Sequence, residues 1–329
     1  MLGDISKSIG KDFLIAAFVP AGLLVGMNAL FVRWGLLPRA WFYDWNAFGA
    51  NKPAAILVAS FAAALALATM SSTMYRAFEG YLVNTIYYVG TTIVASAALV
   101  PPRAMPAVLA AGTSIALVGI AQLVAYRWHR ARAAMLAATL PTEDWSRLYP
   151  RNPREIRETK FGNVLRAFEE YPAVMWNIEP ITTWVRLTAV LPADFAGQIA
   201  DAKTYVTLLL NTSVVAAVLA FETAMLADPS AGTKWLWAVV VWAAVAVFAY
   251  AATPAAAKRW GEYVRTAFDL YRLDLLVRRK VDLPAGPFTF EQEREVWASV
   301  QEATYYTEYS PRGVKLVVTP NTPKRDPWG

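Results

Sequence analysis

The chain has 329 residues, of which 57% are hydrophobic and only 17% carry a charge. About a quarter of the residues of a soluble domain are charged, so this composition indicates a membrane protein. The sequence has no cysteine and one histidine, His129, which excludes disulfide frameworks, thiol nucleophiles and cysteine- or histidine-rich metal sites. In a membrane protein, a net charge of +6 is typical of Lys and Arg that meet anionic lipid head groups, and we expect no nucleic-acid partner.

The N-terminal membrane region is predicted to cover residues 1–126. A membrane-spanning helix needs about 20 mostly apolar residues, and four runs in this region come close to or meet that length. They are 13–34, 53–71, 81–100 and 105–126. The last two are joined by a proline turn, and this 81–126 hairpin either crosses the membrane twice or is re-entrant.

A C-terminal transmembrane hairpin is predicted over residues 205–256, with spans at 205–226 and 235–256. The fold class is therefore an all-α membrane protein with six transmembrane helices, or four if the 81–126 hairpin does not cross. In the six-span arrangement, all but five of the Lys and Arg residues lie on one side of the membrane. The exceptions are Arg33, Arg39, Lys52, Arg103 and Lys234. Basic residues mark the cytoplasmic side, so both termini are predicted to be cytoplasmic.

Two helical cytoplasmic modules complete the predicted organisation, one over 127–204 and one over 257–329 with a flexible tail. In the first module, Asn152 followed by Pro153 has the signature of a helix start, and Pro172 is predicted to end a helix. In the second module, Thr289 and Gln292 form a capping signature for a helix that reaches about residue 306. Both modules are predicted to continue the neighbouring spans without a break.

A G-N-x-L-R-A-x-E-x-Y-P pattern occupies residues 162–172. It is followed by Ile-Glu-Pro at 178–180, by Trp-Val-Arg-Leu at 184–187 and, near the C-terminus, by Asp-Leu-Tyr-Arg at 269–272. Together these segments resemble a family of uncharacterised bacterial multi-pass membrane proteins. The resemblance implies a bacterial inner-membrane protein and carries no established activity.

Polar residues in the fifth span and just before it form the first set of candidate site residues. They are Asn211, Glu222, Thr212 and Asp201. An ionisable residue such as Glu222 inside a span is a candidate ion ligand or proton carrier, although near the span end it can also reach water or Lys234. Asn211 is expected to be an interhelical hydrogen-bond donor. The stripe either lines a pore in an oligomer or forms a polar seam between helices.

The second set of candidates comes from the motif region and is predicted to form a structural or partner-docking network. Its members are Asn163, Arg166, Glu169, Tyr171, Trp184 and Arg186. Paired carboxylates at 169–170 also suit acid–base chemistry or Mg²⁺ binding. The spacing from Arg166 to Glu170 instead favours a salt-bridged helix face.

No nucleophile, metal or cofactor set emerges from the sequence, so we predict a non-enzymatic membrane protein without a cofactor. One hypothesis is an oligomeric channel gated through its cytoplasmic helices. The alternative is a membrane scaffold that recruits a protein complex, favoured by 13 Trp residues, a residue type common at binding hot spots. Expected partners are the bilayer with its anionic head groups and further copies of the chain or other proteins.

Overall fold

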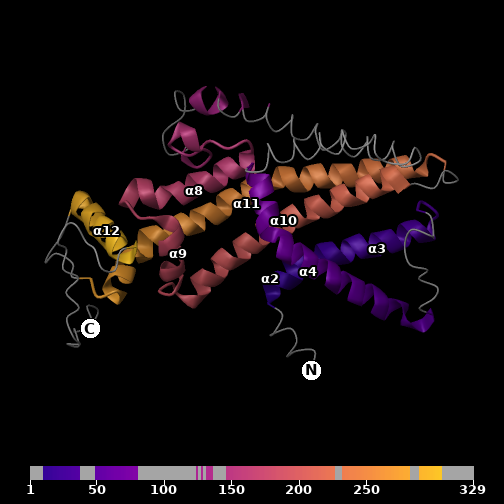
Figure 1. The fold of residues 1–329 in the computed structure, drawn as a ribbon, viewed down its shortest axis with the longest axis horizontal. Coiled ribbons are helices and arrows are strands. Elements are labelled where there is room, and N and C mark those ends of the chain that lie inside the picture. Colours follow the sequence, from indigo (N-terminus) through magenta and orange to yellow (C-terminus); the bar gives the residue numbers. More distant parts are fainter. Residues whose placement is uncertain are drawn as a thin grey trace, which may run out of the picture.

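The computed structural model describes residues 10–37, 49–80, 146–226, 232–281 and 289–305, together with 124, 127–128 and 131–135. Every regular element in this part of the chain is a helix. The helices form an elongated body, with the membrane helices at one end and the helices α8, α9 and α12 at the other (Figure 1). The predicted spans at 81–100 and 105–126, the residue His129 and the tail lie outside the described residues.

Four helical segments are long and apolar enough to cross a membrane. They are Lys11–Arg33, Gly49–Glu79, Ala193–Leu226 and Lys234–Arg278. The first comprises α2 (Lys11–Phe13), a π-helical turn η1 (Leu14–Phe18) and α3 (Val19–Arg33), and the others contain α4 (Lys52–Glu79), α10 (Ala193–Leu226) and α11 (Lys234–Arg278). An all-helical fold with four such segments therefore agrees with four of the predicted spans.

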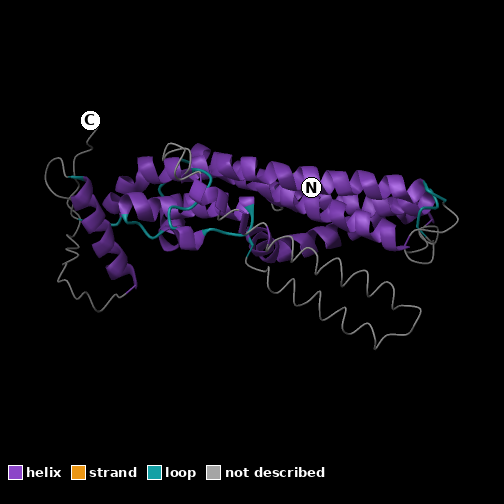
Figure 2. Cartoon of the chain, turned by 90° about the horizontal axis from the view of Figure 1, so that it is seen from above, coloured by secondary structure: helices purple, strands orange, loops and turns teal. Residues whose placement is uncertain are grey.

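Helices α10 and α11 run without a break from the membrane region into the predicted cytoplasmic modules. They contain 34 and 45 residues, or about 51 and 68 Å at about 1.5 Å per residue. A hydrocarbon core is only about 30 Å thick, so both helices extend well beyond it. The predicted continuity of spans and modules is confirmed. Figure 2 shows the long helices lying side by side along the body.

The predicted cytoplasmic part packs three shorter helices against the far half of α11. These are α8 (Lys160–Trp176), α9 (Pro180–Thr188) and α12 (Phe290–Tyr305). Their shared core contains the fully buried side chains of Phe161, Phe268 and Trp297. The capping box at the start of α12 is confirmed: Gln292 Oε1 accepts from the N–H of Thr289 at 2.8 Å, and Thr289 Oγ1 accepts from the N–H of Gln292 at 3.3 Å.

One of the predicted helix boundaries is wrong, and another is confirmed only in part. Pro172 does not end its helix, because α8 continues to Trp176 and closes at Asn177, which has a left-handed φ of 56°. The side chains of Tyr171 and Trp176 both hydrogen-bond a carboxylate on α11 and hold the end of the helix. These contacts offset the loss of the backbone hydrogen bond that Pro172 cannot donate. Asn152 does cap a helix start, but only of the 3₁₀ turn η4 (Pro153–Glu155).

The first membrane helix depends on a polar contact with the fifth predicted span. In α-helical geometry the carbonyl of Ala16 would accept from residue 20, but Pro20 has no N–H. The buried side chain of Asn211 donates to this carbonyl instead, at 2.5 Å. The π-helical turn η1 lies directly before this proline. The interhelical hydrogen bond expected for Asn211 thus compensates a backbone defect.

We expect Asn211→Leu to destabilise the protein by about 1–2 kcal/mol, because the Ala16 carbonyl would be left buried without a donor. The measurement is reversible unfolding in detergent, with Thr212→Val as the neighbouring control. In a Pro20→Ala background a backbone N–H becomes available to the Ala16 carbonyl. Asn211→Leu is then expected to lower the free energy of unfolding by a smaller amount. Equal costs in the two backgrounds would show that Asn211 does not compensate for Pro20.

Candidate functional site

The glycine of the 162–172 motif lies where α8 meets the C-terminal end of α4. A Cβ atom added at Gly162 would overlap the backbone carbonyl of Glu79, so only glycine allows this approach. Thr159 joins the same two helices, because its hydroxyl donates to the carbonyl of Phe78 at 2.5 Å and accepts from the N–H of Gly162 at 2.9 Å. This α4–α8 junction joins α4 to the module of α8, α9 and α12.

Asn163 is fully buried and braces the loop before α8. Its Oδ1 accepts from the N–H of Arg157 at 2.7 Å, and its Nδ2 donates to the carbonyls of Arg157 and Thr159 at 2.9 and 2.8 Å. All of these contacts lie within the chain. Asn163 therefore positions the α4–α8 junction and offers no group to an external ligand.

The charged motif residues form a local salt-bridge network. Arg166 donates from Nε to Glu155 at 3.0 Å, and its Nη1 lies 3.5 Å from a carboxylate oxygen of Glu169. Burial raises the pKa of the Glu169 carboxyl above its ordinary value, and the nearby Arg166 guanidinium opposes that rise. The i,i+4 partner suggested by the sequence, Glu170, instead accepts from the backbone N–H of Arg151 at 3.0 Å.

A second polar cluster joins α8, α11 and α12 around Asp269. The carboxylate of Asp269 accepts from the Tyr171 hydroxyl at 2.8 and 2.9 Å and from Trp176 Nε1 at 3.1 Å. Burial, followed by the hydrogen bond to Asp269, raises the pKa of Tyr171 above its ordinary value. The tyrosine therefore stays protonated and keeps donating.

Arg272 extends this cluster to α12. Its guanidinium lies 3.4 Å from the centre of the Trp176 ring and forms a salt bridge of 2.6 Å with Glu293. Both side chains of the salt bridge are largely buried, at 12% and 8% exposed. A buried ion pair is costly to break, because removing one partner leaves the other charge buried without a counter-ion. The arrangement thus holds α12 on the module.

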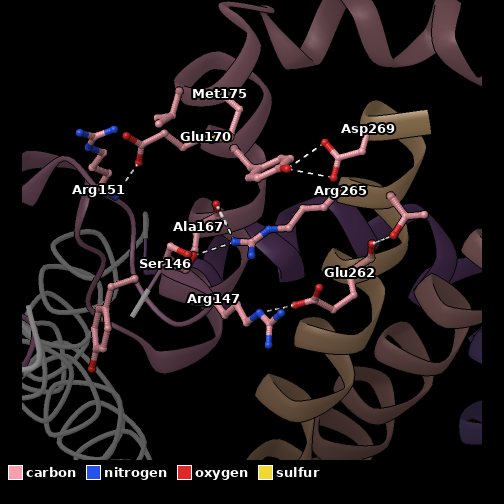
Figure 3. Close-up of a pocket in the computed structure, with 13 residues that line it drawn as sticks. Ser146, Arg147, Arg151, Ala167, Glu170, Met175, Glu262, Arg265 and Asp269 are labelled. Atoms are coloured by element: carbon pink, nitrogen blue, oxygen red, sulfur yellow. Dashed lines mark hydrogen bonds and ion pairs between the residues drawn. The ribbon is translucent and has the colours of Figure 1, made fainter. Parts of the chain in front are cut away.

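A cavity with a volume of about 560 Å³ lies beside this cluster. Its wall carries three arginines and three carboxylates, namely Arg147, Arg151, Arg265, Glu170, Glu262 and Asp269 (Figure 3). Arg265 crosses the cavity and donates to the carbonyls of Ser146 and Ala167 at 2.6 and 3.3 Å. Arg147 pairs with Glu262 at 3.3 Å. Because the charges largely neutralise one another, the cavity does not select an anion or a cation by net charge.

Two further motif candidates lie on α9, away from both clusters. The half-buried Trp184 ring packs near Phe268, with ring centroids 6.0 Å apart. Arg186 is exposed and donates to the carbonyl of Thr182 at 2.6 Å. The six motif candidates therefore do not converge on one site, and only Arg186 is fully exposed.

The polar residues of the fifth predicted span mostly face the first span. Asp201 accepts from Lys11 at 2.7 Å. Near the other end of the span, Glu222 accepts from Asn28 Nδ2 at 3.0 Å. With Asn211 on Ala16, these contacts form a seam between α10 and the first membrane helix. Thr212 is half-buried on the same helix.

No family model, curated protein or solved structure matches this chain. The resemblance carried by residues 162–172 therefore stays a prediction. Within the described part of the chain, no three His, Cys, Asp or Glu side chains come together in a way that could hold a metal ion.

Several residues that organise these sites were not singled out as candidates from the sequence. They are Asn28, Arg265, Asp269, Arg272 and Glu293. Asn28 could have been chosen from the sequence, because it is a side-chain amide inside a predicted span, as Asn211 is. Asp269 and Arg272 had a signal too, because they lie in the 269–272 segment that carries the family resemblance. Arg265 and Glu293 lie in helices with many charges, where only the fold distinguishes a buried charge from a solvated one.

We expect Gly162→Ala to destabilise the protein by about 2 kcal/mol or more, because the new methyl group meets a rigid backbone carbonyl. Gly197→Ala is the matched control, since nothing lies within 4 Å of a Cβ at that helical glycine. Because alanine has a higher helix propensity than glycine, this control is expected to raise the free energy of unfolding by up to about 1 kcal/mol. Thermal unfolding of both variants in detergent is the measurement, and similar effects at the two positions would contradict the proposed close approach.

Proposed function

We propose that the protein is a membrane-anchored scaffold that presents a rigid helical docking surface to a cytoplasmic partner. The observation that carries this proposal is an exposed apolar face on α9. Ile181 and Val185 are 74% and 72% exposed, and their i,i+4 spacing places them on one side of the helix. Thr183 and Leu187, on the opposite side, are buried against the module.

The exposure of this pair matches that of residues that face lipid. Phe248 and Trp237, on the predicted transmembrane part of α11, are 74% and 73% exposed. Lipid accounts for exposed apolar side chains there. On α9 it does not, because α10 separates the helix from the bilayer: the stretch from Ala193 to Tyr205, where the apolar run begins, spans about 18 Å at about 1.5 Å per residue.

The expected partner therefore has an apolar groove or helix with an acidic rim. The apolar part would cover Ile181 and Val185, and the acidic rim would meet Arg186, which is exposed beside them. Exposed apolar side chains bordered by charge are typical of protein–protein contacts. The continuous helices α10 and α11 would keep this surface at a fixed height above the membrane.

We expect the double substitution Ile181→Asp with Val185→Asp to lower recovery of a co-purified partner at least about tenfold, because two charges would enter an apolar contact. The measurement is quantitative affinity purification from native membranes, with Ala200→Asp, an exposed site on α10, as the control. The proposal fails if the double variant and the control recover every partner equally, or if the wild type has no stable partner.

An oligomeric channel is the second candidate, and the carboxylate of Glu222 inside a predicted span favours it. The seam contacts of Asp201, Asn211 and Glu222 use these groups within one chain. A pore would therefore require them to exchange partners when copies assemble. Single-channel recording from folded, oligomeric protein in liposomes tests this candidate, and silence across monovalent and divalent ions counts against it.

A further inference from the structure

A small cavity lies between α10 and α11 at the level where both helices leave the apolar region. Its volume is about 280 Å³. The wall consists of Gln198, Asp201, Ala202 and Tyr205 on α10 and Ala256, Arg259 and Tyr263 on α11. The apolar run of α10 begins at Tyr205 and that of α11 ends at Ala256. The cavity therefore sits at the predicted cytoplasmic edge of the bilayer, where lipid head groups lie.

The wall of this cavity contains one basic side chain, Arg259, and one carboxylate, Asp201. Arg259 is exposed and, within the described part of the chain, makes no salt bridge. The one carboxylate in the wall, Asp201, is held by the ammonium group of Lys11 at 2.7 Å. Lys11 starts the first membrane helix, so three membrane helices meet at this level. A second carboxylate, Asp12, lies beside Lys11 and accepts from the Thr204 hydroxyl at 2.7 Å. Among the described residues here, Arg259 is the cation that no carboxylate holds.

Neutral hydrogen-bond donors lie beside Arg259 in the same cavity. The cavity is lined by the phenol groups of Tyr205 and Tyr263 and by the amide of Gln198. Tyr205 is 54% exposed, and no hydrogen bond to the hydroxyl of either tyrosine occurs among the described residues. A guanidinium beside hydroxyl and amide donors is the set that binds a phosphate oxygen well.

The surface that leads from the cavity toward the membrane centre is apolar. On α11, Ala252 and Phe248 follow Ala256 at helical spacing on the same side, and both are exposed. Phe248 is 74% exposed, and it lies about 12 Å from Ala256 along the helix at about 1.5 Å per residue. A ligand bound in the cavity could therefore extend an apolar chain along α11.

We propose that this cavity is a binding site for an anionic phospholipid, with the headgroup phosphate on Arg259 and the acyl chains along Ala252 and Phe248. The guanidinium of Arg259, which no carboxylate holds among the described residues, favours an anionic headgroup over a zwitterionic one, and the phenol donors fix the phosphate between the two helices. Basic pockets between transmembrane helices at the cytoplasmic face suit such head groups. The site depends on the membrane-spanning helices and not on the docking surface of α9, so the two proposals stand or fall separately.

The test is thermal unfolding of the full-length protein in neutral detergent, titrated with phosphatidylglycerol or with phosphatidylcholine. A lipid that binds the folded state raises the unfolding temperature with its concentration. We expect phosphatidylglycerol to raise it more than phosphatidylcholine. Arg259→Gln is expected to weaken the apparent affinity for phosphatidylglycerol at least about fivefold, because a charge-assisted hydrogen bond is lost.

Two variants serve as controls in this titration. Lys234→Gln removes an exposed cation at the opposite end of α11 and is expected to bind phosphatidylglycerol as the wild type does. Arg259→Lys keeps the charge but not the two-pronged geometry, and it is expected to retain part of the affinity. If Arg259→Gln does not fold, this lysine variant and Tyr263→Phe, which removes one donor, carry the test.

Three results would overturn the proposal. The first is equal stabilisation by the two lipids, and the second is equal loss of affinity in Arg259→Gln and Lys234→Gln. The third is stabilisation by inorganic phosphate alone at the same concentration, since that would make the site one for a soluble anion. Selective stabilisation by phosphatidylglycerol that depends on Arg259 and Tyr263 supports it.

Discussion

The pairing of α10 with α11 is the constraint on which the rest of the structure depends. Neither helix is interrupted where it leaves the apolar region, although Pro254 of α11 has no backbone N–H to donate to the carbonyl one turn before it. Small residues on α11 allow other helices to come close. Gly261 is one of them, because a Cβ at this position would meet the Phe168 ring of α8. The module of α8, α9 and α12 is thus built directly on the extensions of membrane helices.

Polar groups in this protein mainly hold helices together. Asn211 compensates for the proline in the first membrane helix, Gly162 and Thr159 join α4 to α8, and Asp269 ties Tyr171 and Trp176 to α11. Each of these groups is satisfied within the chain, which favours a structural role for the motif. The surfaces left for other molecules are the apolar face of α9 and the cavity at Arg259 at the predicted membrane edge.

The sequence predicts the parts of this fold that depend on local pattern. Long apolar runs locate four membrane helices, and the Thr289–Gln292 capping box locates the start of α12. Pro172 was misread because its cost is offset by contacts with Asp269, which lies 97 residues farther along the chain. The partner of Asn211 could not be predicted for the same reason, since Ala16 is distant in sequence. The six motif candidates were predicted to form one network, and their separation into different clusters depends on how α8 and α9 pack.

The most direct test of this account is whether the membrane helices and the module of α8, α9 and α12 move as one body. The sequence contains no cysteine, so spin labels can be placed at Thr188 on α9 and Phe248 on α11, both exposed, without removing native thiols. Double electron–electron resonance spectroscopy would then measure the distance between the two labels in nanodiscs. The account predicts one narrow distance distribution that is the same in detergent. A broad or multiple distribution would show that the module moves independently of the membrane helices and would contradict the central claim.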